Sequence, residues 1–288
     1  MKKQIVGIVV LMLVATTVVS ATQVNVKDNN QMTKSGVDVP VWKKGDSWMY
    51  KDHQVQFAYK KDGTVWYSVF FNYNETDTIT DDTGGNYTMK ITITNDQCRE
   101  TWGSFRLEYT PLTKFTWEII LRKTDLALVS QSYQIKGLVF WLIGKINFPI
   151  PAQFSNTNEW TNTPPSVVFP FPLTAGTNGT IANSSYTGHQ KVSLYWGLIK
   201  LFKADYSGYS GKQNYTCKMA NISVPAGTYD AYNVSVESTY GLGHSISWSY
   251  YAPEAGYYVK QYIDDSWNET GKPGYFYESE LVSTTYTP

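Results

Sequence analysis

The stretch VQFAYKKDGTVWYSVFFNYN, from Val55 to Asn74, decides the fold class. Two runs in which aromatic or β-branched residues alternate with polar ones flank the pair Asp62-Gly63. An Asp-Gly pair between two alternating segments is a strong short-range signal for a β-hairpin. The next segment, NYTMKITITND from Asn86 to Asp96, alternates strictly and predicts a further half-buried strand.

The composition agrees with a mainly β protein. Aromatic residues make up 16% of the 288 residues, with 23 Tyr and 10 Trp, while only 17% are charged. Aromatic and β-branched side chains fit a pleated, half-buried surface. Trp48 and Tyr50 are two positions apart and should share one face of a strand. The formal net charge is zero and basic residues are not clustered, so we expect no nucleic-acid partner.

The N-terminus has the layout of a secretory signal peptide. Lys2 and Lys3 precede an uncharged apolar run that ends in the small residues Ser20 and Ala21. We expect cleavage after Ala21, with an uncleaved anchor as the alternative, and therefore an extracellular or cell-surface location. Residues 22–39 read as a flexible polar leader, and 40–288 as a single β-rich domain. We expect no membrane span in the mature chain.

Two cysteines, Cys98 and Cys217, are expected to pair as a disulfide, because an oxidising compartment allows it. Two isolated buried thiols are the alternative. Neither cysteine has a second Cys or a His at ligand spacing, so we expect no metal site. No cofactor motif is present, and we expect no cofactor.

Sequons of the form Asn-x-Ser/Thr recur along the chain. In an exported protein they are candidate glycan acceptors, which must face solvent. The alternative is that a chain rich in Ser, Thr and Asn produces such triplets without modification. The candidate glycosylation sites are Asn74, Asn86, Asn178, Asn183, Asn214, Asn221, Asn233 and Asn268.

An apolar insertion is expected around residues 133–205. Its two most apolar stretches, residues 137–154 and 191–206, could form one or two short helices or long buried strands, since periodicity does not separate these options. Their aromatic and aliphatic residues could line a pocket for an apolar ligand or fill the core of a curved sheet. The candidate ligand-binding residues are Phe140, Trp141, Leu142, Tyr195, Trp196 and Leu198.

No catalytic constellation is apparent. A glycosidase would need two carboxylates on facing elements, and we expect Glu108, Glu118 and Glu237 to be ordinary strand residues. The segment TDTITDDTGG, which contains Asp77, is expected to be a solvated turn, with calcium binding as the lesser alternative. We therefore expect no catalytic residues and a non-enzymatic protein.

The motif VPAGTYDA at 224–231 and the later YYAPEAGYYVKQY at 250–262 carry a resemblance to a known group. With KKGDSWMY at 43–50 and FPFPLTAG at 169–176, they resemble exported prokaryotic proteins of unknown function with a V-P-A-G-T-[YF]-[DE]-A motif. That group is distantly similar to the LolA/LolB lipoprotein-carrier fold. The resemblance implies a strongly curved antiparallel sheet or half-open barrel around an apolar cavity. The sequons point to an archaeal source.

Three hypotheses of function follow. The first is a secreted or cell-surface glycoprotein that binds an apolar or lipid-like ligand in a concave sheet. The second is a structural surface or filament subunit whose leader adds as a strand to a neighbour's sheet edge or to other surface proteins. The third is a secreted hydrolase. If Asn233 carries a glycan, its face of the strand is the wet one and Tyr232, Val234 and Val236 point inward.

Overall fold

The structure is a computed structural model that describes the chain from residue 36 onward. The described residues are 36–60, 62–103, 105–143, 146–195, 202–209, 213–240, 243–265 and 274–288. The expected signal peptide, most of the expected leader, and the candidate residues Trp196, Leu198 and Asn268 lie outside them. Of the leader, Val37 pairs with Leu173 in an isolated bridge.

Every regular element in the described part of the chain is a β-strand, which confirms the mainly β fold class. The strands are β1 Ser47–Tyr59, β2 Val65–Asp81, β3 Asn86–Trp102, β4 Phe105–Tyr109, β5 Lys114–Arg122, β6 Leu128–Ile143, β7 Ile146–Ser166, β8 Asn178–Ile181, β9 Ser185–Tyr195, β10 Phe202–Tyr209, β11 Gln213–Val224, β12 Gly227–Tyr240, β13 Gly243–Ala252, β14 Tyr257–Asp265 and β15 Tyr275–Thr284.

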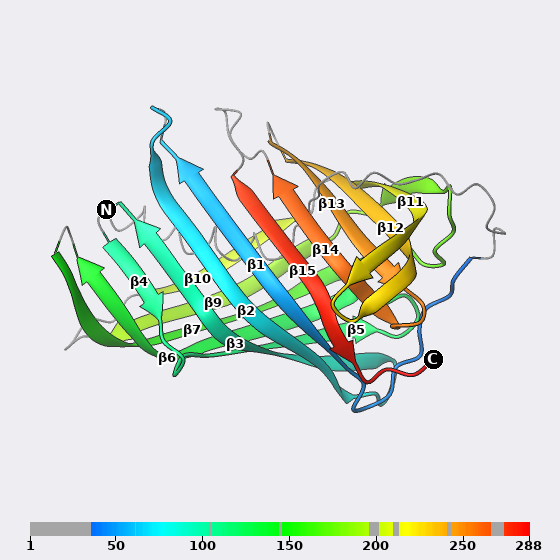
Figure 1. Cartoon of the computed structure of the whole chain (residues 1–288), viewed down its shortest axis with the longest axis horizontal. Helices are drawn as coiled ribbons and strands as arrows, with labels where there is room; N and C mark the ends of the chain where they lie inside the picture. The colour runs from blue at the N-terminus through cyan, green and yellow to red at the C-terminus, as the bar shows by residue number, and fades with distance from the viewer. Residues whose placement is uncertain are drawn as a thin grey trace.

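All of these strands belong to one antiparallel sheet of 15 strands. Its order is β10-β9-β7-β6-β4-β3-β2-β1-β15-β14-β13-β12-β11-β8, and β5 pairs with both β3 and β6. The sheet curves back on itself, so that β1, β2, β3, β14 and β15 form a front layer that crosses β5, β6, β7, β9 and β10 behind it (Figure 1). This arrangement matches the expected curved sheet or half-open barrel.

The first hairpin forms where the sequence predicts it. β1 and β2 pair from Ser47↔Thr78 to Tyr59↔Val65, and Gly63 adopts a φ of 79° between them. The Asp62 carboxylate accepts hydrogen bonds from the backbone N–H and the hydroxyl of Thr64, at 2.9 and 2.6 Å. A glycine tolerates this left-handed conformation because it has no Cβ.

The short strands β4 and β5 lie end to end between the long strands β3 and β6 and pair with both of them. The first half of β3 pairs with β5 and its second half with β4, and β6 pairs with both in the same way. Between β4 and β5 the chain bulges toward Gly137, where a Cβ would come within 2.5 Å of the Leu112 carbonyl oxygen. A glycine at this position lets the two backbones approach each other closely.

The middle of the chain is part of the sheet. Residues 137–143 and 146–151 are strand in β6 and β7, so the helical alternative for this stretch is wrong. The second apolar stretch contributes strand to β9 and β10, and residues 196–201 between them lie outside the described part. Apolar runs of this length are compatible with either structure, and pairing with neighbouring strands decides between them.

Two clusters of buried side chains fill the space between the layers. The larger centres on Trp42, Trp48 and Tyr257, and the smaller on Tyr109 and its neighbours Leu107, Phe115, Val139 and Phe154. Trp48 and Tyr50 both point into the larger cluster, as their spacing predicts. The half-buried Ile93 packs against both clusters.

The expected disulfide between Cys98 and Cys217 is wrong. Both cysteines are buried, and neither takes part in a disulfide in the described fold. Cys98 lies on β3 in the smaller cluster, whereas Cys217 lies on β11 in the larger one. A disulfide requires Cα atoms less than about 7 Å apart, so the alternative of two isolated thiols describes the fold. Burial raises the pKa of the Cys217 thiol to about 11.

The VPAGT motif forms a two-residue turn. Pro225 and Ala226 connect the paired residues Val224 and Gly227 at the tip of the β11–β12 hairpin. The Ala226 N–H donates to the carbonyl of Leu281 at 3.0 Å, which fastens this tip to β15. The motif therefore has a structural role in the described fold.

The sequons on this hairpin do not mark a single wet face. Asn221 pairs with Asp230 and Asn233 with Lys218, so the two asparagines project from opposite faces. Asn221 is exposed, while Asn233 is half-buried and its Oδ1 is shielded from solvent without a hydrogen-bond partner. Tyr232 and Val234 are buried, as expected, and Val236 is half-buried.

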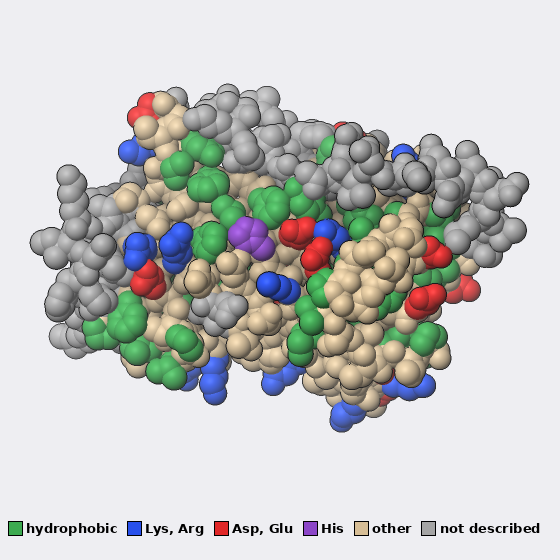
Figure 2. Space-filling view, viewed as in Figure 1, with side chains coloured by type: hydrophobic (Ala, Val, Ile, Leu, Met, Phe, Trp, Pro, Cys, Tyr) green, Lys and Arg blue, Asp and Glu red, His purple; other side chains and the backbone are tan. Residues whose placement is uncertain are grey.

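The outer face of the front layer mixes charges of both signs with apolar and neutral polar side chains (Figure 2). Lys260 on β14 lies 2.7 Å from both Glu278 and Glu280 on β15. Arg99 lies over the ring of Phe70 at 4.8 Å. No helix among the described residues is long and apolar enough to cross a membrane.

Candidate functional site

A cavity of about 110 Å³ lies between the two layers, next to the smaller core cluster. Strands β1 to β4 contribute one wall and β5 to β7 the other. Most of the lining consists of aromatic and aliphatic side chains, joined by a few amides and one carboxyl group. The lining residues are Gln54, Gln56, Val69, Phe71, Tyr73, Ile93, Cys98, Glu100, Tyr109, Phe115, Thr116, Trp117, Tyr133, Gln134, Ile135 and Asn156.

The front wall is built by strand register. Gln56 on β1 lies opposite Val69 on β2, which lies opposite Glu100 on β3. Side chains of directly paired residues project from the same face of a sheet. The amide of Gln56 and the carboxyl of Glu100 therefore flank Val69 on the inner face.

Glu100 is the only carboxyl group among the described residues that line the cavity. Its side chain is 2% exposed, and its Oε1 accepts a hydrogen bond from the Tyr109 hydroxyl at 2.6 Å. Burial raises the pKa of Glu100 to about 7, while the Tyr109 hydrogen bond works in the opposite direction. The second oxygen, Oε2, is buried without a partner, as is Oε1 of Gln56.

The polar groups of the back wall bond to one another. Gln190 donates to Asn156 at 3.2 Å, and Asn156 donates to the Tyr133 hydroxyl at 3.3 Å. The Trp117 indole donates to Gln131 at 3.1 Å. Gln131 Nε2 and Gln190 Oε1 are also buried without a partner, but these two residues are not among the described lining of the cavity, whereas Glu100 and Gln56 are.

Three more carboxyl groups are buried beyond Tyr73 on the same inner face. Asp77 lies opposite Trp48, Glu75 opposite Tyr50, and Asp52 opposite Tyr73. None is more than 5% exposed. We call Asp52, Glu75 and Asp77 the carboxyl trio. Contrary to the sequence expectation, Asp77 belongs to the interior of a strand and not to a solvated turn.

The trio is held largely in the protonated form. Burial raises the pKa of Asp52 to about 7 and that of Asp77 to about 8. The pKa of Glu75 is raised well above its ordinary value by burial and by the nearby charges of Asp77 and Asp52. Glu75 and Asp77 share a hydrogen bond, which requires a proton on one of them. Asp52 accepts from the Tyr277 hydroxyl at 2.8 Å.

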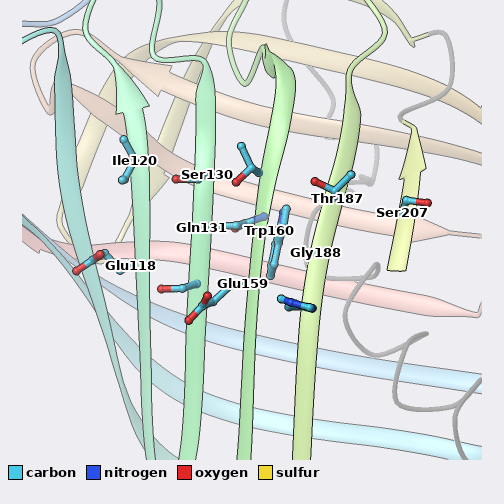
Figure 3. Close-up of a pocket in the computed structure, with 12 residues that line it drawn as sticks. Glu118, Ile120, Ser130, Gln131, Glu159, Trp160, Thr187, Gly188 and Ser207 are labelled. Atoms are coloured by element: carbon cyan, nitrogen blue, oxygen red, sulfur yellow. The ribbon is translucent and has the colours of Figure 1, made fainter. Parts of the chain in front are cut away.

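A second hollow, of about 770 Å³, lies across strands β5, β6, β7, β9 and β10, and we call it the outer hollow. Its residues come from neighbouring strands, as Figure 3 shows. Glu118, Ser132, Glu159 and His189 form one cross-strand row in it. These side chains are largely exposed. Among the described residues, no group of three or more His, Cys, Asp or Glu side chains is placed so that it could hold a metal ion.

Of the residues proposed for ligand binding, Phe140 has a described side chain, and it is not among the described residues that line the interior cavity. Phe140 is half-buried on β6 and lies next to the buried Val139, from which it faces the opposite side of the sheet. Trp141 and Leu142 follow on β6, where they pair with Ile150 and Pro149 of β7. Tyr195 ends β9 and pairs with Gln153. The described residues that line the cavity come from strands β1 to β7.

The sequence carried a usable signal for this wall. If Trp48 and Tyr50 point inward, then 52, 54 and 56 must do so as well, because side chains alternate with a period of two. Positions 52, 54 and 56 are Asp, Gln and Gln, so the inward face of β1 continues with polar side chains. Cavity-lining polar groups were thus predictable from the register of β1 alone.

Most described sequons are on the surface. Asn74, Asn86, Asn178, Asn183, Asn214 and Asn221 are exposed. Three of these, Asn178, Asn214 and Asn221, lie on β8 and β11 at one end of the sheet. The carboxylates considered for a hydrolase lie apart: Glu108 pairs with Arg106, Glu118 lies on the outer hollow, and Glu237 is exposed on β12.

The fold is that of a curved antiparallel β protein, with an aromatic-lined pocket between its layers. No protein family, curated protein or solved structure matches the chain.

Proposed function

We propose that the protein is a non-enzymatic, exported glycoprotein that binds a small apolar ligand, or the end of a longer apolar chain, between its two sheet layers. The observation that carries the proposal is the interior cavity of about 110 Å³ with aromatic walls. Close-packed cores contain few voids larger than a water molecule, so a cavity of this size between two packed layers is a binding space.

The lining supports this choice over the outer hollow. Phe71, Tyr109 and Phe115 surround the cavity with ring centroids 5.3 to 5.7 Å apart. Ligand pockets combine apolar and aromatic walls with a few placed polar groups, and Glu100 and Gln56 are such groups here. The outer hollow is broad and lined mainly by Ser, Thr and charged side chains.

Filling the cavity should abolish binding. We expect the wild-type protein to bind n-butanol, and Val69→Phe, which places a ring into the space, to weaken that binding about tenfold or more. Val65→Phe is the matched control, because Val65 lies on the same strand but is 48% exposed. Isothermal titration calorimetry measures both, and Ile135→Phe repeats the test from the opposite wall. Equal affinities for wild type and both cavity variants would contradict the proposal.

Glycan occupancy tests the export proposal. On protein purified from its own host, we expect glycopeptide mass spectrometry to find glycans at exposed sequons such as Asn221, and none at Asn233. The Asn233 side chain is half-buried with a shielded oxygen, and a bulky glycan there would have to displace its neighbours. Full occupancy at Asn233, or bare asparagine at every sequon, would count against this assignment.

A further inference from the structure

The interior cavity has a chemical bias that the proposed apolar ligand does not explain. Two of its lining oxygens, Glu100 Oε2 and Gln56 Oε1, are buried without a hydrogen-bond partner. Leaving a buried polar group unpaired costs about 1–3 kcal/mol, and more for a charged group. Amide oxygens and carboxylates accept hydrogen bonds, so the missing partner is a donor.

The charges around the cavity favour a cation. Of the described residues that line it, none is Lys, Arg or His, and the one carboxyl group belongs to Glu100. Facing Glu100 are Tyr109 from β4 and Tyr67 from β2, both neutral because burial raises their pKa well above the usual value. An ionised Glu100 therefore has no countercharge among the described side chains of the cavity.

The walls of the cavity are suited to the same ligand. Phe71, Tyr73, Tyr109, Phe115, Trp117 and Tyr133 present aromatic rings to the space. An ammonium group over such rings gains cation–π attraction, about 2 kcal/mol or more when water is excluded.

The volume of the cavity limits the size of the ligand that can bind in it. An engineered protein cavity of about 150 Å³ holds benzene, which has six heavy atoms. A cavity of about 110 Å³ therefore holds about four or five heavy atoms by the same proportion. A primary ammonium carries three N–H donors, and a chain of about four carbons fills the remaining space.

We infer that the cavity binds a small primary amine with a short alkyl tail, whose ammonium group pairs with Glu100 and donates to Gln56. This inference rests on the proposed function, because it names the ligand class of the same cavity. The apolar tail lies among the aromatic rings. The ligand supplies both the missing donor and the missing countercharge.

The test compares n-butylamine with n-butanol, which has the same tail and a neutral head, by isothermal titration calorimetry at pH 8 on the full chain. We expect wild type to bind n-butylamine at least tenfold more tightly than n-butanol. Glu100→Gln should remove this preference and retain n-butanol binding, since Gln keeps an acceptor for Tyr109. Glu118→Gln, on the outer face, should leave the preference unchanged.

A second measurement needs no variant. Because Glu100 must be ionised to pair with the ammonium, the affinity of wild type for n-butylamine should rise roughly tenfold or more from pH 5.5 to 8, relative to n-butanol at each pH. Equal binding of the two probes, or a preference that survives Glu100→Gln, overturns the amine inference and leaves the apolar pocket in place. Failure of both probes to bind overturns the pocket itself.

Discussion

The free energy of unfolding should fall by several kcal/mol as the pH rises from 4 to 8. The cause is four buried carboxyl groups, Glu100 and the carboxyl trio of Asp52, Glu75 and Asp77, whose pKa values are raised by burial. In the unfolded chain these groups ionise near pH 4. Between pH 4 and 8 the folded protein therefore binds more protons than the unfolded chain, and stability decreases with pH across this window.

The size of the decrease in the free energy of unfolding follows from the pKa shifts of these carboxyl groups. One carboxyl whose pKa rises from about 4 to about 7 loses roughly 4 kcal/mol of stabilisation across the window, at about 1.4 kcal/mol for each pH unit. None of the ion pairs among the described residues involves a member of the trio, so no cation offsets this loss. The stabilisation is fully present below about pH 4, and it is lost progressively as the pH rises through the raised pKa values, which are about 7 for Asp52 and about 8 for Asp77.

The Asp52→Asn variant measures how much of the pH dependence of stability comes from the Asp52 carboxyl group. The amide is close in shape to the protonated carboxyl and can still accept the Tyr277 hydroxyl hydrogen bond. We expect the variant to match wild type near pH 4 and to be more stable by roughly 2–4 kcal/mol at pH 8. Urea unfolding curves from pH 4 to 8 measure this, and Glu118→Gln is the exposed control. Parallel pH profiles for Asp52→Asn and wild type would refute the assignment.

The local pattern predicted the sheet because each strand carries its own signal. The Asp62-Gly63 turn and the alternation of residues 86–96 were sufficient to place β1, β2 and the start of β3 in an antiparallel array. The run around Phe140 was ambiguous, because an apolar stretch of this length can pack as helix or strand. Its pairing with β4 and β7 settles the structure, and pairing is a long-range property.

The binding site was harder to predict because its residues come from many strands. Glu100, Gln56 and Tyr109 are 9 to 53 positions apart in sequence and meet only through the register of β1 to β4. The apolar run at residues 137–143 suggested ligand-binding residues, but an apolar run indicates only that a segment is buried. Buried polar residues in an alternating strand identify the site better, since burying them without a purpose is costly.

Trp48→Ala should be the most destabilising single substitution in the front layer. The indole is fully buried, and its ring lies 5.2 Å from that of Trp42 and 5.4 Å from that of Tyr257. Removing a buried tryptophan side chain costs about 3–5 kcal/mol. The Trp48 Nε1–H also donates to the Ala255 carbonyl at 2.6 Å, and an unpaired carbonyl would add to the loss.

The hydrogen bond from Trp48 to the Ala255 carbonyl explains why the destabilisation by Trp48→Ala should extend beyond β1. Trp42 donates in the same way to the neighbouring Gly256 carbonyl at 2.8 Å, so both indoles hold the turn between β13 and β14. Gly256 has a φ of 67°, and a Cβ there would meet the Tyr286 ring at 2.4 Å. The YAPEAG segment is therefore fixed by contacts on both sides, with indole donors on one and the Tyr286 ring on the other.

Comparing three variants separates packing from hydrogen bonding. Trp48→Phe keeps most of the ring but loses the donor, and we expect it to cost about 1–3 kcal/mol. Trp48→Ala should cost several kcal/mol more, a large fraction of the 5–15 kcal/mol typical of a folded domain. Trp66→Ala, at a half-buried position on β2, should cost less than either. If Trp48→Ala and Trp66→Ala shift the urea midpoint equally, the Trp42–Trp48–Tyr257 cluster is not the centre of the fold's stability.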